Sequence, residues 1–246
     1  MSYYIIQGKS KLSGSVKVNS TKNSTLALLC ASLLNQGQTE FFNFPDLEEN
    51  KRIMEVLASI GVKFTWLGKR QVRVNAPKQL LLSKINYQAA VKTRAVLMLF
   101  GPLIHRFKSF QLPMSGGCQL GLRTITPYIY ALENFGVNIK SRPRWFKVTR
   151  NPKIHNQEIV MYESGDTATE AVLMAAALTP AKTVIKYASA NYQIQELCFY
   201  LQKLGVKIQG LGTTTLTVHG VRSVNKKVNY HLAEDPIEGM LFISLA

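Results

Sequence analysis

The sequence predicts a mixed α/β (α+β) fold built from a repeated unit with the order strand, helix, strand, helix, strand, strand. Three segments that share one layout carry this prediction: residues 53–74, 128–148 and 197–218. In each segment an amphipathic helix ends at a glycine, and two short strands with alternating apolar residues follow. The three glycines lie about seventy residues apart, which indicates a supersecondary unit that occurs three times.

Each repeated helix carries its apolar face in the same register. Apolar residues stand eight, five, four and one positions before the glycine, a spacing typical of one helical face with a glycine C-cap. The glycines are Gly61, Gly136 and Gly205. The strands that follow them are expected at residues 62–64 and 72–74, 137–139 and 146–148, and 206–208 and 216–218. The expected start signals are a capping box of Asp46 with Glu49 for the first helix and Thr126-Pro127 for the second.

Each unit also has a first half that contains an apolar helix. In the first unit we expect a strand at Ser15–Val18 and a helix at Thr25–Leu34. In the third we expect a strand at Glu158–Tyr162 and a helix at Ala168–Leu178, and in the second a helix over Ala89–Phe100. Three such units packed together would bury the apolar helices centrally and hold the sheets outside.

A fourth unit begins near the end of the chain and is truncated. Val228–Leu232 is predicted as a strand, 233–236 as a loop, and 237–246 as the start of an apolar helix. A helix without a polar face exposes apolar surface to water. We therefore expect the sequence to be a fragment of a longer protein.

The composition indicates a globular protein with anionic partners. Thirty Lys and Arg against fourteen Asp and Glu give a formal net charge of +16, which suits nucleic acid, an acidic membrane or phosphorylated metabolites. The alternative is that the excess is spread over a solvated surface. The three cysteines form neither a disulfide framework nor a zinc motif. No signal peptide and no run long enough for a membrane span occur, so a cytoplasmic location is the simplest interpretation.

The stretch Ser115–Arg123 has the composition of a reactive loop. Cys118 stands among glycines, Arg123 follows it, and a predicted helix begins just after. Glycine lets a ligand approach the backbone closely, and positive charge near a thiol favours the thiolate. A lone cysteine is more often a packed core residue. Cys118 is therefore either a small buried residue or a nucleophile or proton donor.

Basic and amide side chains stand near the starts of the apolar helices. Lys22 and Asn23 enter the first helix, and Arg94 lies near the start of the corresponding helix of the second unit. In a quasi-symmetric packing these helix starts converge on one face, where Lys and Arg would clamp a phosphate or carboxylate. The alternative for each is a solvated side chain.

A set of short motifs occurs in a fixed order along the chain. They are Thr21-Lys22-Asn23-Ser24, Val91-Lys92-Thr93-Arg94, Phe100-Gly101-Pro102-Leu103, Gly116-Gly117-Cys118-x-x-Gly121-x-Arg123, Leu204-Gly205-Val206-Lys207-Ile208 and Asp235-x-Ile237-Glu238. Each motif alone is weak, but the ordered set resembles the UDP-N-acetylglucosamine enolpyruvyltransferases, the 1-carboxyvinyltransferases of peptidoglycan synthesis. That family forms an inside-out α/β barrel of six βαβαββ units in two lobes, which agrees with the repeat.

The resemblance implies transfer of the enolpyruvyl group of phosphoenolpyruvate to the 3-hydroxyl of UDP-N-acetylglucosamine, with release of phosphate and without a cofactor or metal ion. Cys118 would donate a proton to the methylene carbon. Lys22 and Arg123 would hold the phosphate and carboxylate, and Asn23 would contact the sugar. Arg94 would reach the nucleotide side, and Thr124, Ile125, Thr126 and Pro127 would also bind substrate.

The resemblance also implies a domain organisation. Residues 21–221 would form the three-unit lobe with the cysteine loop, 222–246 would begin a second lobe, and strands within 1–20 would belong to that second lobe. In the family the second lobe supplies an aspartate base and another phosphate-binding arginine. The missing C-terminal lobe is thus the expected partner, and we expect the chain alone to be inactive.

Departures from the family pattern concern the nucleotide site and leave alternatives open. Thr126 stands where the family usually has aspartate, residues 188–193 replace an Arg-Glu-Pro-Glu stretch, and Gly165-Asp166-Thr167 replaces Ser-Val-Gly. Pro236 replaces an arginine. A degenerate, non-catalytic homologue is one alternative. A basic RNA-binding or RNA-processing protein of related fold is another, although the dispersed charges make nucleic acid unlikely. The shikimate-pathway enolpyruvyltransferase ranks lower because it lacks a cysteine equivalent to Cys118.

Overall fold

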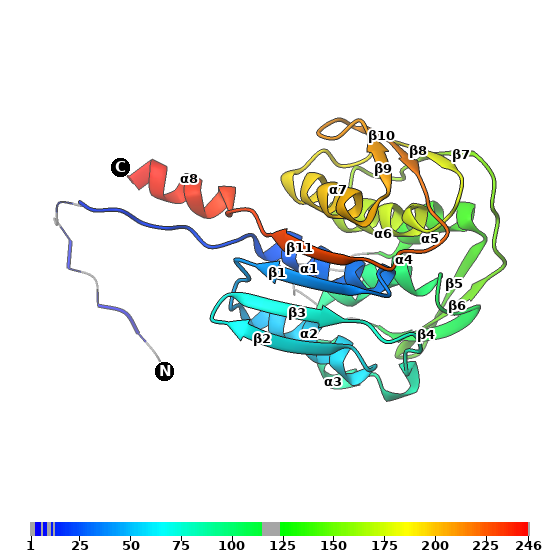
Figure 1. The fold of residues 1–246 in the computed structure, drawn as a ribbon, viewed down its shortest axis with the longest axis horizontal. Helices are drawn as coiled ribbons and strands as arrows, with labels where there is room; N and C mark the ends of the chain where they lie inside the picture. Colours follow the sequence, from blue (N-terminus) through cyan, green and yellow to red (C-terminus); the bar gives the residue numbers. More distant parts are fainter. Residues whose placement is uncertain (1–2, 6, 9–10, 12, 115–123, 246) are drawn as a thin grey trace.

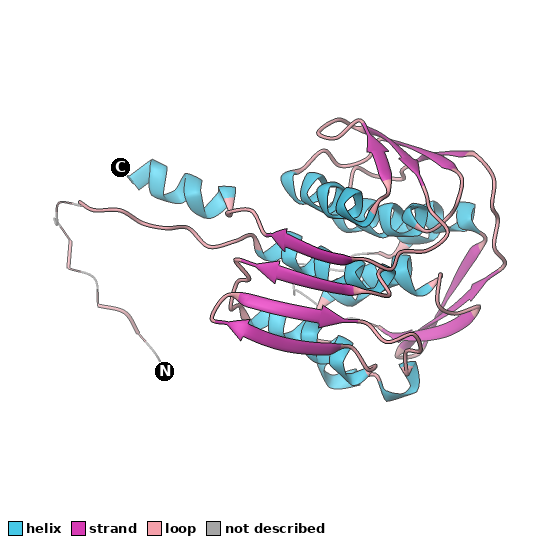
Figure 2. Cartoon of the chain, viewed as in Figure 1, coloured by secondary structure: helices cyan, strands magenta, loops and turns pink. Residues whose placement is uncertain are grey.

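The structure is a computed structural model that describes residues 3–5, 7–8, 11, 13–114 and 124–245. It confirms the mixed α/β fold. Within the described residues, three β-sheets lie on the outside and the helices pack between them (Figures 1 and 2). Each sheet is built mainly from one of the three predicted units.

Most of the predicted elements are present with small shifts of their ends. The first unit contains α1 (Lys22–Ala31), η1 (Ser32–Leu34), β1 (Gln38–Phe42), α2 (Glu48–Ser59), β2 (Lys63–Gly68) and β3 (Gln71–Asn75). The second contains η2 (Leu82–Lys84), α3 (Tyr87–Ala90), η3 (Arg94–Leu99), α4 (Phe100–Leu103), β4 (Ser109–Pro113), α5 (Thr126–Leu132), η4 (Glu133–Phe135), β5 (Val137–Arg142) and β6 (Trp145–Arg150). The third contains β7 (Gln157–Val160), α6 (Asp166–Ala177), β8 (Lys182–Lys186), α7 (Tyr192–Leu204), β9 (Lys207–Gln209) and β10 (Thr215–His219). They are followed by β11 (Lys227–His231) and α8 (Pro236–Leu245).

The first sheet takes its outer strand from the far end of the chain. The strand predicted at Ser15–Val18 is wrong, since these residues lie in no strand. The strand expected to open the fourth unit is β11, which pairs in parallel with β1 and gives the order β11-β1-β3-β2. The third sheet, β7-β8-β10-β9, has the same pattern with β7 parallel to β8. Tyr230 fixes β11 there, because its ring packs on the rings of Phe41 and Tyr200.

Three helical segments form the centre of the molecule, as the apolar patterns predict. α1, η3 with α4, and α6 contact one another, and most of their side chains are fully buried. Small residues let them approach closely. A Cβ added to Gly101 of α4 would lie 2.5 Å from the carbonyl oxygen of Ala171 in α6. The central helices therefore fix the relative positions of the three units.

Several local predictions about helix starts are wrong. The helix expected over Ala89–Phe100 is divided, because Thr93 is extended and its Oγ1 accepts a hydrogen bond from Ala95 N, which starts η3 at Arg94. Asp46 forms no capping box with Glu49. It lies before the first turn of α2 and pairs with Lys51 at 2.6 Å.

The glycine C-caps are confirmed at all three positions. Gly61, Gly136 and Gly205 have φ values of +106°, +74° and +100°, a region that residues with a Cβ rarely adopt. The helix predicted after residue 236 also forms, as α8. None of its described side chains is buried, and Ile237, Met240 and Leu241 are more than half exposed. Within the described residues, no helix is long and apolar enough to cross a membrane.

Candidate active site

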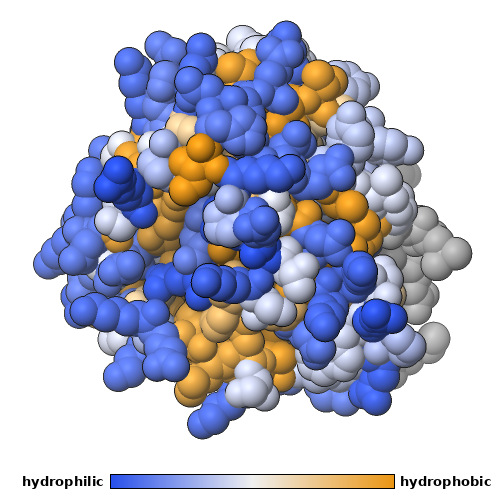
Figure 3. Space-filling model, turned by 90° about the vertical axis from the view of Figure 1, so that its right-hand side faces the viewer, coloured by the Kyte–Doolittle hydropathy of each residue, from blue (hydrophilic) through white to orange (hydrophobic). Residues whose placement is uncertain are grey.

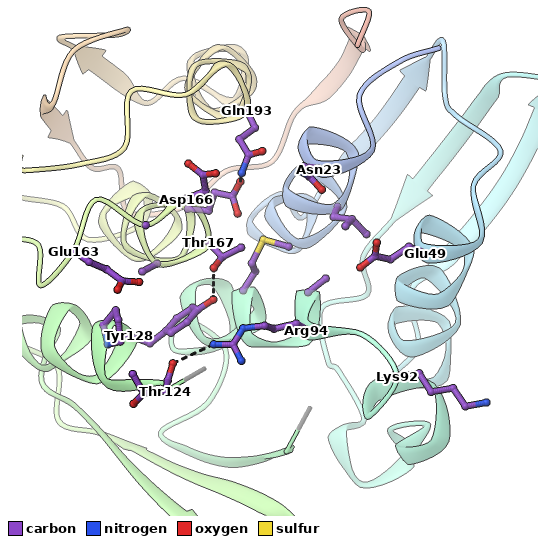
Figure 4. A pocket seen from close by; sticks show the side chains of 17 residues that line it. Asn23, Glu49, Lys92, Arg94, Thr124, Tyr128, Glu163, Asp166, Thr167 and Gln193 are labelled. Atoms are coloured by element: carbon purple, nitrogen blue, oxygen red, sulfur yellow. Dashed lines mark hydrogen bonds between the residues drawn. The ribbon is translucent and has the colours of Figure 1, made fainter. Parts of the chain in front are cut away.

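The N-terminal ends of the three central helical segments surround a pocket of about 620 Å³. All three units contribute to it, which confirms that the helix starts converge. The pocket is shown in Figure 4. Helix N-termini carry partial positive charge and free N–H groups, so this end of the fold suits an anionic ligand. The lining side chains that carry polar groups are Asn23, Glu49, Lys92, Arg94, Thr124, Tyr128, Glu163, Asp166, Thr167, Glu170 and Gln193.

Four of the predicted site residues line this pocket: Asn23, Arg94, Thr124 and Pro127. Lys22 is the first residue of α1, and its Nζ lies 2.6 Å from Glu49 Oε2. Because Glu49 lines the pocket, Lys22 stands at its edge.

Two further predicted site residues, Ile125 and Thr126, do not line the pocket. The Ile125 side chain is half-buried against the hydrophobic core. Thr126 is the first residue of α5, and its N–H donates to Thr124 Oγ1 at 3.1 Å. Thr124, and not Thr126, therefore supplies the side-chain acceptor at this helix start. Cys118 and Arg123 lie outside the described residues, so their roles stay predictions.

Arg94 joins two elements of the second unit at the pocket. It is the first residue of η3, and its Nη2 donates to the carbonyl oxygen of Thr124 at 3.1 Å (Figure 4). This contact holds the guanidinium near Tyr128 of α5, whose hydroxyl donates to Thr167 Oγ1 at 2.6 Å. Burial is the main reason why the pKa of Tyr128 is raised. Tyr128 is therefore a neutral hydrogen-bonding group that ties α5 to α6.

The opposite wall is acidic, which the sequence analysis missed. Glu163 in the connection before α6, and Asp166 and Glu170 in the first two turns of α6, line the pocket. Asp166 accepts hydrogen bonds from Ser189 Oγ at 2.5 Å and Asn191 Nδ2 at 3.2 Å, which joins the starts of α6 and α7.

Glu170 is fully buried and accepts a hydrogen bond from Gln193 Nε2 at 3.3 Å. Burial, together with the charge of Asp166, raises the pKa of Glu170 to about 8. The carboxyl group is therefore largely protonated at neutral pH. A signal was available in the sequence, since Glu170 is the one acidic residue within an alanine-rich helix after its first turn.

The pocket is thus polarised across its width. The η3 and α5 side presents Arg94 and Lys92, although Lys92 points away from the other labelled residues in Figure 4. Glu49 also lines the pocket near η3, but its carboxylate is paired with Lys22. The α6 side presents carboxyl groups. Within the described part of the chain, no group of three or more His, Cys, Asp or Glu side chains could hold a metal ion. This arrangement suits a ligand with an anionic part on one side and hydrogen-bond donors on the other.

Comparison with known proteins agrees with this architecture. Residues 6–246 match the family model described as EPSP synthase (3-phosphoshikimate 1-carboxyvinyltransferase). The chain belongs to the EPSP synthase family. This confirms the resemblance drawn from the motifs and shows that the chain is a member of an enzyme family, the carboxyvinyltransferases.

Two curated relatives share one name. The UDP-N-acetylglucosamine 1-carboxyvinyltransferase of Bradyrhizobium diazoefficiens is 30% identical over 243 residues, which are 99% of this chain and 56% of the relative. That of Treponema denticola is 31% identical over 246 residues, 100% of this chain and 57% of the relative. The chain therefore spans just over half the length of the curated relatives it matches.

Solved structures of the family share the fold. The enolpyruvyl transferase NikO from Streptomyces tendae has a TM-score of 0.78 at 19% identity, over 97% of this chain and 56% of that one. An EPSP synthase from Acinetobacter baumannii has a TM-score of 0.69 at 14% identity, over 90% and 50%. At these identities the likeness establishes the fold alone.

Proposed function

We propose that the protein transfers the enolpyruvyl group of phosphoenolpyruvate to the 3-hydroxyl of UDP-N-acetylglucosamine, the first committed step of peptidoglycan synthesis. The observation that carries the proposal is the pocket at the helix starts. Asn23, Arg94 and Thr124 meet there in a chain about 30% identical, over nearly its whole length, to relatives with this activity in their name.

The proposed chemistry is an addition followed by an elimination. Cys118 gives its proton to the methylene carbon of phosphoenolpyruvate, while the acceptor hydroxyl oxygen bonds to the adjacent carbon and loses its proton to a base. The carbon–oxygen bond to phosphate then breaks, and a proton leaves the new methyl group. Lys22 and Arg123 offset the charge on phosphate and carboxylate, a role in which fixed cations are most effective.

The acceptor lies toward Asn23 and Arg94 in this proposal. Asn23 hydrogen-bonds the sugar, and Arg94 with residues 124–127 contacts the nucleotide. Arg94 is suited to this position because its hydrogen bond to Thr124 O already limits its side-chain rotamers. Little entropy is then lost when a ligand binds.

We further propose that a second lobe completes the site and that this chain alone does not turn over. In the family the aspartate base is expected from the second lobe, and the matched relatives are almost twice as long as this chain. The exposed apolar side chains of α8 are the surface on which such a lobe would pack.

The test is phosphate release from phosphoenolpyruvate by the full-length protein. We expect release that requires UDP-N-acetylglucosamine, and loss of at least about a hundredfold in kcat on Cys118→Ser. Cys198→Ser is the matched control, because Cys198 is a buried free cysteine of α7 that does not line the pocket. Phosphate release that requires 3-phosphoshikimate instead would show that the protein catalyses the shikimate-pathway reaction. No release with either acceptor would indicate the degenerate homologue.

A further inference from the structure

A second pocket, of about 600 Å³, lies at the opposite end of the same three central helical segments. Its wall includes Leu34 at the end of η1, Arg106 after α4, and Leu178 after α6. Arg150 at the end of β6 and Arg222 in the connection after β10 complete it. It is therefore separate from the candidate active site, which lies at the other ends of these helices.

Cationic side chains dominate this pocket. Arg106, Arg150, Arg222 and His105 line it, and its lining includes no Asp or Glu. Among the described residues, no carboxylate lies within 4 Å of any of the three arginines. The charge of Arg106 and Arg150 is half-buried, and this burial lowers the pKa of both. Half-buried cations without a counter-charge are unfavourable unless something offsets them.

Backbone carbonyls at the helix ends hold two of these arginines in place. Arg106 Nη2 donates to Leu33 O at 2.7 Å, and Arg150 Nη1 donates to Ile104 O at 2.6 Å. These bonds satisfy carbonyls that a helix C-terminus leaves free. Arg150 Nε is buried and has no hydrogen-bond partner in the described part of the chain.

The helix ends offset only part of the positive charge. A helix C-terminus carries about half a negative charge, so three of them supply at most about −1.5 against three guanidinium groups. His105 adds no charge, because burial and the two neighbouring arginines lower its pKa to about 3. The remainder of about +1.5 matches a phosphate monoester, which carries about −1.5 to −2 at neutral pH.

Most of the remaining wall is apolar, which narrows the class of ligand. Its apolar side chains are Leu34, Pro152, Ile154, Leu178, Pro180 and Val224, and Gln36 and Ser223 add two uncharged polar groups. The face turned to the viewer in Figure 3, the right-hand end of Figure 1, mixes hydrophilic side chains with apolar patches. An inorganic anion would leave this apolar wall in contact with water. We propose that the second pocket binds a small organic phosphate with an apolar portion, at a site distinct from the active site.

The test measures binding of hexyl phosphate to the full chain by calorimetry, with inorganic phosphate and hexanoate as comparison probes. We expect hexyl phosphate to bind at least about tenfold more tightly than inorganic phosphate, because the alkyl chain covers the apolar wall. Hexanoate should bind more weakly than hexyl phosphate, because it carries one charge. Equal binding of hexyl phosphate and inorganic phosphate would overturn the proposal.

Two variants locate the site. Arg222→Glu should weaken hexyl phosphate binding by at least about tenfold, since it reverses an exposed charge at the pocket rim and leaves the packed arginines intact. Arg142→Glu is the matched control: Arg142 is exposed on β5 outside the pocket, and affinity should stay within about twofold. Equal losses in both variants would show general attraction to a basic protein and refute a built site. Loss of binding in Arg94→Gln would place the ligand in the active-site pocket and also refute it.

Discussion

Replacement of Gly101 by alanine tests whether the central helices are packed as closely as the structure shows. The new methyl group would lie 2.5 Å from Ala171 O and 2.9 Å from Met174 Cβ. The first contact is with backbone, so relief requires α4 and α6 to move apart. Overpacking of this kind costs about 1–3 kcal/mol, and alanine regains about 0.5–1 kcal/mol of helix propensity. The difference spans about 0–2.5 kcal/mol, and because a contact with backbone puts the cost in the upper part of its range, we expect a net loss of about 1–2 kcal/mol.

The assay is urea and thermal unfolding followed by circular dichroism. For a chain of this size, the loss corresponds to a decrease of roughly 2–8 °C in Tm. Gly239→Ala is the matched control, since Gly239 lies in the exposed helix α8 and an added Cβ would meet only Val18 Cγ1 at 4.0 Å. Its stability should be unchanged or slightly higher. Equal unfolding midpoints for Gly101→Ala and wild type would refute the close contact between α4 and α6.

Three further predictions concern the candidate active site. Glu170→Gln should remove a pH dependence of stability. The pKa of Glu170 in the folded protein, about 8, lies above its ordinary value. Wild type therefore loses stability as the pH rises from about 4.5 to about 8. Urea unfolding across that window should show that the free energy of unfolding of the variant increases relative to that of wild type as the pH rises. Tyr128→Phe should cost about 1 kcal/mol in the same assay through loss of the bond to Thr167, and an unchanged midpoint would contradict that bond. In the phosphate-release assay, Arg94→Gln should lower kcat/KM for the sugar nucleotide by about 10–100-fold. A decrease of this size in kcat/KM for phosphoenolpyruvate, with kcat/KM for the sugar nucleotide unchanged, would contradict the assignment of Arg94 to the acceptor site.

Local sequence patterns were sufficient for most of the secondary structure. The strands after each C-cap glycine form where alternation predicts them, because the 3.6-residue and two-residue periods directly report which side chains face the core. The errors fall where neighbours decide the outcome. Thr93 interrupts a continuous apolar pattern because its hydroxyl caps the next turn, and Asp46 turns to Lys51 instead of capping α2.

The candidate site was predictable in its location but not in its full composition. The convergence of Asn23 and Arg94 followed from the repeat, because equivalent helix starts in quasi-equivalent units must lie at one end of the bundle. The buried carboxyl group of Glu170 is different. Its elevated pKa depends on complete desolvation and on Asp166 nearby, and desolvation arises only when α1, α5 and α7 enclose α6.

The sequence by itself determined the repeated unit, the apolar helices at its centre and the family, because these depend on local periodicity and on motif order. Tertiary structure alone decided that β11 pairs with β1, since this contact joins residues far apart in the chain and depends on Tyr230 finding its aromatic partners. Tertiary structure also decided that a pocket lies at each end of the central helices. One pocket has an acidic wall and the other is lined by arginines, a difference set by which connections cover each end.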